Sequence, residues 1–143
     1  MSYDLGVFDP SVAPKSGPEF TNWYVVQTEW EEPHNYDDPA VSAPSLRAWF
    51  IDMIKEFPAM NGPFAQPDRG DDDRVSDYSV GRSLIYVGFR WSEAQEAYEA
   101  CYRLAAKHGV GFIDASGDEG DVWFPDGEDG RGLVRTFSLL PDD

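Results

Sequence analysis

The sequence predicts an α+β fold: a ferredoxin-like split βαβ sandwich with an antiparallel four-stranded sheet, an extra helix and a C-terminal acidic hairpin-like extension. Two observations support this prediction. Long stretches carry apolar residues at helical spacing, and shorter apolar stretches alternate as strands do, in the order β-α-α-β-β-α-β. A length of 143 residues suits one domain, 1–143, with a core at 1–116 and the acidic extension at 117–143.

The first part of the chain contains one predicted strand and two predicted helices. The stretch YDLGVFD alternates as a strand and ends at Pro10. Ser16 and Glu19 have the spacing of a helix-capping box, so we expect a helix from there to about Trp30. The second helix stops at Pro58 and is marked by one apolar stripe, which consists of Leu46, Trp49, Phe50, Met53, Ile54 and Phe57.

The second part of the chain contains the other strands and the third helix. After a loop at 61–74, DYSVGRSLIYVGFRW indicates two strands with a turn near Gly81 and Arg82. Ser92 and Gln95 repeat the capping spacing, and Gly109 ends the helix that follows. VGFID is the fourth predicted strand. The short strand DVWF and the last apolar run LVRTFSLL are expected to form the added edge hairpin.

The charge of the chain limits the classes of partner. Asp and Glu number 27 against 11 Lys and Arg, and the net charge of −16 is unfavourable near phosphate backbones and anionic lipid. We therefore expect no nucleic-acid partner and no membrane partner. The single cysteine and the absence of a signal-like N-terminus lead us to expect a cytoplasmic protein.

No group of residues predicts a catalytic site, a cofactor or a metal. The stretch that begins at Asp114 lacks the calcium-loop pattern, because Glu119 and Pro125 stand where that loop needs glycine and glutamate. Cys101 lies on the apolar stripe of the third helix and is expected to be an inert core residue. His108 is expected to interact with the dipole at the end of that helix.

Two acidic stretches supply the candidate binding residues. Residues 114–130, DASGDEGDVWFPDGEDG, hold seven acidic side chains and no basic one around a Trp and a Phe. An aromatic side chain ringed by carboxylates suits an interface with a basic protein, with Trp123 as the buried anchor. The expected partner-binding residues are Asp118, Glu119, Asp121, Trp123, Asp126, Glu128 and Asp129, with a second patch of Tyr36, Asp71, Asp72 and Asp73. Arg69 and Arg74 flank these three aspartates and are expected to pair with them.

The chain resembles a family of small bacterial proteins. The resemblance rests on the opening MSYDLGVFDP, the helix end IKEFP, and LIYVGFRWSEAQEAYEACYRLAAKHGVGFIDASG, about half of the chain. These residues look like fold signatures rather than catalytic motifs. Such proteins are similar to the immunity proteins encoded beside polymorphic and contact-dependent toxins, and the resemblance implies a protein that binds a cognate toxin.

Three functions follow as hypotheses. The first is an immunity protein that occludes the active site of a cognate basic toxin, since opposite charges speed association. The second is an acidic DNA mimic, which would compete with DNA for several basic proteins. The third is an enzyme or small-ligand binder that uses the sheet face, because ferredoxin-like folds host many chemistries.

Overall fold

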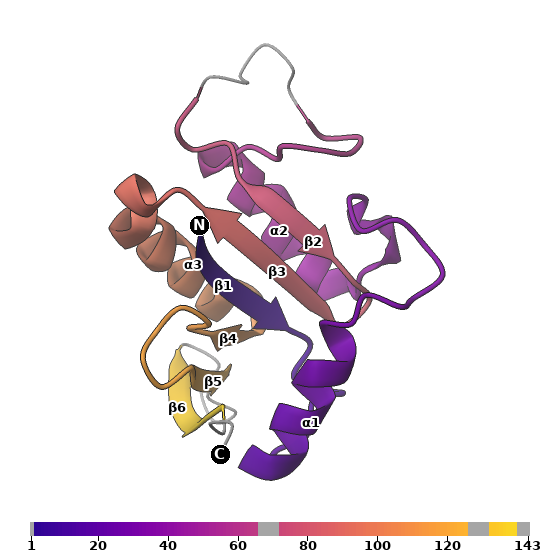
Figure 1. The fold of residues 1–143 in the computed structure, drawn as a ribbon, viewed down its shortest axis with the longest axis vertical. Coiled ribbons are helices and arrows are strands. Elements are labelled where there is room, and N and C mark those ends of the chain that lie inside the picture. Colours follow the sequence, from indigo (N-terminus) through magenta and orange to yellow (C-terminus); the bar gives the residue numbers. More distant parts are fainter. Residues whose placement is uncertain (1, 66–71, 126–131, 140–143) are drawn as a thin grey trace.

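The computed structural model describes residues 2–65, 72–125 and 132–139, and it is an α+β structure built on one sheet (Figure 1). The sheet is antiparallel and has the strand order β2-β3-β1-β4-β5-β6. Its strands are β1 (Tyr3–Phe8), β2 (Asp77–Val80), β3 (Leu84–Phe89), β4 (Gly111–Ile113), β5 (Asp121–Pro125) and β6 (Leu133–Ser138). The helices are α1 (Gly17–Gln27), α2 (Pro44–Glu56) and α3 (Ala94–His108), with the short 3-10 helices η1 (Pro39–Val41) and η3 (Trp91–Glu93).

The sheet has six strands rather than the four that the sequence predicted. The C-terminal hairpin of β5 and β6 continues the sheet, because β5 pairs with β4 through Phe112↔Trp123 and Ile113↔Val122. The mixed helix and strand content of the prediction is confirmed. The chain after residue 116 is thus joined to β4 by strand pairing.

Both faces of the sheet carry apolar cores, because helices cover each of them. On one face Leu5 and Val7 pack with residues of α2 and α3, which lie behind the sheet in Figure 1. On the opposite face Phe8 packs edge-on against Phe20 of α1, with ring centroids 5.0 Å apart. Side chains alternate along β5 in the same way, so successive residues of this strand belong to different cores.

Two helix ends differ from the prediction, and a third lies where it was predicted but lacks the expected capping bond. Ser16 is the N-cap of α1, but its side chain makes no capping hydrogen bond. The helix ends at Gln27, and Trp30 lies beyond it with a φ of 55°. Ser92 does not cap α3, because the turn η3 precedes the helix and Glu93 takes the cap position. The end of α3 at Gly109, with a φ of 68°, agrees with the prediction.

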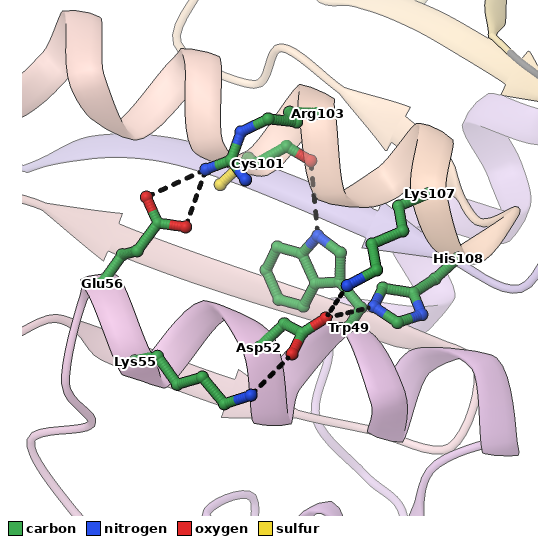
Figure 2. Close-up of polar contacts among 8 residues, drawn as sticks. All are labelled: Trp49, Asp52, Lys55, Glu56, Cys101, Arg103, Lys107 and His108. Atoms are coloured by element: carbon green, nitrogen blue, oxygen red, sulfur yellow. Dashed lines mark hydrogen bonds and ion pairs between the residues drawn. The ribbon is translucent and has the colours of Figure 1, made fainter.

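Polar contacts hold α3 against α2 (Figure 2). The Asp52 carboxylate lies 2.9 Å from Lys107 Nζ, 2.7 Å from His108 Nε2 and 3.1 Å from Lys55 Nζ. Lys107, then His108 and Lys55, hold the pKa of Asp52 well below its usual range. His108 lies in the last turn of α3, as the sequence predicted, and also contacts Asp52 of α2.

A second set of contacts in Figure 2 extends this helix pairing. Arg103 Nη2 lies 2.7 and 2.9 Å from the two Glu56 carboxylate oxygens, and Trp49 Nε1 donates to the Cys101 carbonyl at 3.3 Å. These contacts fix the position of α3, whose tyrosines border the candidate site described next.

Candidate functional site

The connection between β4 and β5 forms a hollow of about 290 Å³ lined by carboxylates. The Ser116 N–H donates to the Asp4 carbonyl at 3.0 Å, and the Ser116 hydroxyl accepts from the Asp4 N–H at 2.7 Å, so this connection is tied to β1. Gly120, with a φ of 63°, then turns the chain into β5. We call this site the acidic hollow, and its lining residues are Asp114, Gly117, Asp118, Glu119, Gly120 and Asp121. Three of the expected partner-binding residues are therefore brought together, joined by Asp114.

The carboxylates of the acidic hollow differ in their surroundings. Burial, followed by the charge of Asp121, raises the pKa of Asp114, and its buried Oδ1 has no hydrogen-bond partner among the described residues. Asp121 accepts a hydrogen bond from the Ser138 hydroxyl at 2.8 Å and lies 3.0 Å from Arg135 Nε; the Ser138 bond, followed by Arg135, lowers its pKa.

The outer carboxylates leave the acidic hollow negative. Glu119 contacts Arg135 more loosely, at 3.8 Å, and both side chains are exposed. Asp118 is exposed and makes no ion pair with a residue in the described ranges. Among the described residues, Arg135 is the one cation paired with these carboxylates, so a positively charged surface brought near this hollow is attracted to it.

Aromatic side chains from η3, β1, α3 and β5 pack against one another. The Tyr3 and Trp91 rings lie 5.1 Å apart, Tyr98 stacks on Tyr102 at 6.3 Å, and Tyr102 meets Trp123 edge-on at 5.3 Å. Burial, followed by the charge of Asp114, raises the pKa of both Tyr3 and Tyr98. We call these residues the aromatic row: Trp91, Tyr3, Tyr98, Tyr102 and Trp123.

The two tryptophans of the aromatic row differ in exposure. Trp123 was expected in polar surroundings, yet it is half-buried in β5 and packs on the α3 side of the sheet. Its Nε1 is buried, and no residue in the described ranges accepts a hydrogen bond from it. Trp91, by contrast, is 52% exposed, although it ends the stretch DYSVGRSLIYVGFRW, which the sequence predicted to form two strands. Its position directly before a helix start was the signal that it could leave the core. Trp91 therefore fits the role of an interface anchor better than Trp123.

The second acidic patch reaches the aromatic row at Trp91. Asp73 lies 3.3 Å from Arg90, the residue directly before Trp91. Asp72 accepts a hydrogen bond from the backbone N–H of Arg74 at 2.9 Å. The Arg74 guanidinium pairs with Glu93 at 2.8 Å and lies over the Phe57 ring. Glu93, from the turn before α3, is thus an ion-pair partner of Arg74 that its position in the sequence did not indicate.

Tyr36 lies away from both acidic groups, beside the opposite edge strand of the sheet. Its carbonyl accepts from the Val80 N–H of β2 at 2.8 Å, and its ring contacts Trp30 at 5.1 Å. In Figure 1 this segment (purple) and the β4–β5 connection (orange) lie on opposite sides of the molecule. The other expected binding residues, Asp71, Asp126, Glu128 and Asp129, lie outside the described residues.

Within the described ranges no group of three or more His, Cys, Asp and Glu residues is arranged to hold a metal ion. Cys101 is buried, as the sequence predicted, and burial raises the pKa of its thiol. In the same ranges no helix has both the length and the apolar character of a membrane span. No family model, curated protein or solved structure matches the chain.

Proposed function

We propose that this chain is an immunity-type protein that binds a basic bacterial toxin domain and occludes its active site. Two observations support the proposal: the carboxylates gathered in the acidic hollow, and the exposure of Trp91 at the end of the aromatic row. Carboxylates favour a basic partner, and an exposed tryptophan is the side chain most enriched among strong interface contacts. The resemblance of the N-terminal and α3 sequences to immunity proteins supports a neutralising role in the cytoplasm.

The two parts of the surface have separate roles in this proposal. Asp118 and Glu119 are exposed and act at a distance, so they speed the encounter with a positively charged partner. Trp91 loses its water contact on binding, so it slows dissociation. Asp114 and Trp123 lie deeper and hold the shape of the surface from below.

We also propose that β1 to β4, with the helices between them, form a ferredoxin-like split βαβ unit. The strand order β2-β3-β1-β4 and the antiparallel pairing support this assignment, as does the position of α2 and α3 on one face. The connection that forms the acidic hollow then begins where this unit ends. Such an added segment is a natural place for partner specificity, because it can vary without disturbing the unit.

Growth of a naive bacterial host tests the proposed function. The partner is first captured with the tagged chain from the organism that encodes it, at low and high salt, and is then expressed alone or with the chain. We expect the partner to stop growth and the wild-type chain to restore it. The variant D118N/E119Q combined with W91A should fail to restore growth while remaining folded.

A matched variant separates the site from total charge. E19Q/E29Q also removes two exposed carboxylates, one from α1 and one just beyond its end, and should restore growth as the wild type does. A partner that leaves growth unaffected would contradict the proposal. Capture of many basic proteins that all wash off at high salt would contradict it too, and would favour a general nucleic-acid mimic.

A further inference from the structure

A second hollow, of about 510 Å³, opens near the other end of β5. Pro10, Ser11 and Lys15 from the connection between β1 and α1 line one side of it. The remaining lining residues are Gly109, Phe124, Pro125 and Thr136. We call this site the lysine hollow. Its volume falls within the range of small-ligand sites, about 300–1,000 Å³.

The described lining of the lysine hollow is less negative than the rest of the chain, and the Asp9 carboxylate lies next to it, bound by Ser11. No carboxylate of a described residue lines it, although the net charge is −16. The Lys15 ammonium is exposed and makes no ion pair with a residue in the described part of the chain. Lys15 is therefore the one charged group that the described lining offers to a ligand.

The other polar groups of the lining are already engaged. The Ser11 hydroxyl and N–H both donate to Asp9 Oδ1, at 2.7 and 2.9 Å. The Thr136 hydroxyl donates to the Val134 carbonyl at 3.0 Å. Polar recognition in this hollow thus falls to Lys15, whose ammonium can donate to an anionic oxygen.

The floor of the lysine hollow is rigid and apolar. Phe124 is 8% exposed, and its ring meets those of Phe8, Phe20 and Phe137 at 5.1, 6.2 and 5.8 Å. Pro125 adds a second apolar surface beside it. Because this floor is part of the core, it is formed before any ligand arrives, and a ligand need not order it.

We propose that the lysine hollow binds a small monocarboxylate with an apolar or aromatic body. The carboxylate lies at Lys15 Nζ, and the body covers Phe124 and Pro125. A single ammonium matches a single negative charge, and the apolar floor provides no partner for a second one. This site is independent of the proposed toxin-binding surface, because the two hollows share no lining residue.

A titration followed by the backbone amide signals in ¹⁵N NMR tests this proposal, with 4-phenylbutyrate as the probe. We expect saturable shifts of the Ser11, Gly109 and Thr136 amides, with a Kd below about 10 mM. The neutral analogue 4-phenylbutan-1-ol has the same body and should bind about two- to fivefold more weakly, the gain that an exposed ion pair gives.

Two variants complete the test. K15Q should weaken the binding of 4-phenylbutyrate about two- to fivefold. K55Q removes an exposed lysine of α2 and should leave the Kd unchanged. The proposal is overturned by the absence of saturable shifts, by equal binding of the acid and the alcohol, or by an unchanged Kd for K15Q.

Discussion

The acidic hollow and the lysine hollow lie toward opposite ends of β5, and they differ in almost every physical respect. Asp121 opens the strand among carboxylates and backbone turns, whereas Phe124 and Pro125 close it among apolar side chains and one lysine. The pleat places the side chains of Asp121 and Phe124 on opposite faces of the sheet. Asp121 and Trp123 share the face covered by α3, while Val122 and Phe124 belong to the core under α1.

Substitutions at the two ends of β5 should affect different properties of the protein, binding at one end and stability at the other. The lining of the acidic hollow is largely charged and partly exposed, so changes there alter electrostatics more than packing. The floor of the lysine hollow is core, so changes there alter packing first. Substitutions in the acidic hollow should therefore be tolerated by the fold, whereas substitutions in the floor of the lysine hollow should destabilise it.

The largest effect is expected for Phe124→Ala, which empties the floor of the lysine hollow. The loss of contacts with Phe8, Phe20 and Phe137 should lower the free energy of unfolding by about 3–5 kcal/mol. Urea unfolding of the wild type and the variant measures this change in the free energy of unfolding. Val134→Ala on β6, where the side chain is 51% exposed, is the control and should cost less than about 0.5 kcal/mol. Similar small losses for both variants would contradict the contrast between the two ends of β5.

Trp91→Ala is expected to have the next largest effect, on binding rather than on stability. The free energy of binding to the toxin partner should become weaker by about 2 kcal/mol, because the variant removes the exposed Trp91 side chain that would contact the partner. Isothermal titration with the captured partner gives the value. Val26→Ala removes another exposed apolar side chain, on α1, and should leave the affinity unchanged. If both variants bind as the wild type does, Trp91 is not the anchor.

Asp114→Asn is expected to stabilise the protein at neutral pH by up to about 1 kcal/mol. The folded-state pKa of Asp114 is raised above its unfolded value by burial and by Asp121, so its ionised form costs stability above that pKa. This cost disappears as pH falls through the raised pKa. The advantage of the variant should therefore shrink on acidification.

Urea unfolding of wild type and Asp114→Asn across this pH range checks the sign. Asp118→Asn, an exposed neighbour in the same hollow, is the control and should change stability little at any of these pH values. An advantage of Asp114→Asn that grows on acidification would show that the carboxylate is stabilising instead.

The smallest effect is expected for Asp118→Asn on the rate of association. Removing one exposed carboxylate should slow the encounter with the partner about two- to threefold at low salt, with the dissociation rate unchanged. Stopped-flow mixing resolves the two rates. The difference should vanish at high salt because the charge is screened, and a salt-independent difference would indicate a direct contact.

Much of the helical part of the fold could be predicted from local sequence. The apolar stripe around Trp49 and the glycine after His108 each depend on residues a few positions apart, and both are found as expected. The pairing of β5 with β4 was harder to predict from local sequence, because the acidic and glycine residues around DVWF are typical of loops. Whether these residues form a strand depends on their pairing with β4, which is distant information that the local sequence does not contain.

The candidate site was predictable in its charges but not in its anchor. Asp118, Glu119 and Asp121 are close in sequence and lie together. The sequence could not show which of Trp123 and Trp91 is more exposed. The alternation of a strand indicates the face of the sheet on which a residue lies, but it does not indicate which helix covers that face. Tyr102 of α3 packs on Trp123, whereas Trp91 sits in the turn before that helix and stays exposed.

The lysine hollow had no local signal at all. Lys15, Gly109 and Thr136 come from three distant segments, and only the folded chain brings them together. Lys15 alone, among 27 acidic residues, gave no reason to expect a site for an anion.

Hydrogen exchange of the free protein and of its complex with the captured partner locates the binding surface on the chain. We expect new protection at residues 114–121 and around Trp91, with little change at 30–43 or at the lysine hollow. Protection that instead concentrates on α1 or on the segment around Tyr36, with 114–121 unchanged, would contradict the acidic hollow and the aromatic row as the binding surface.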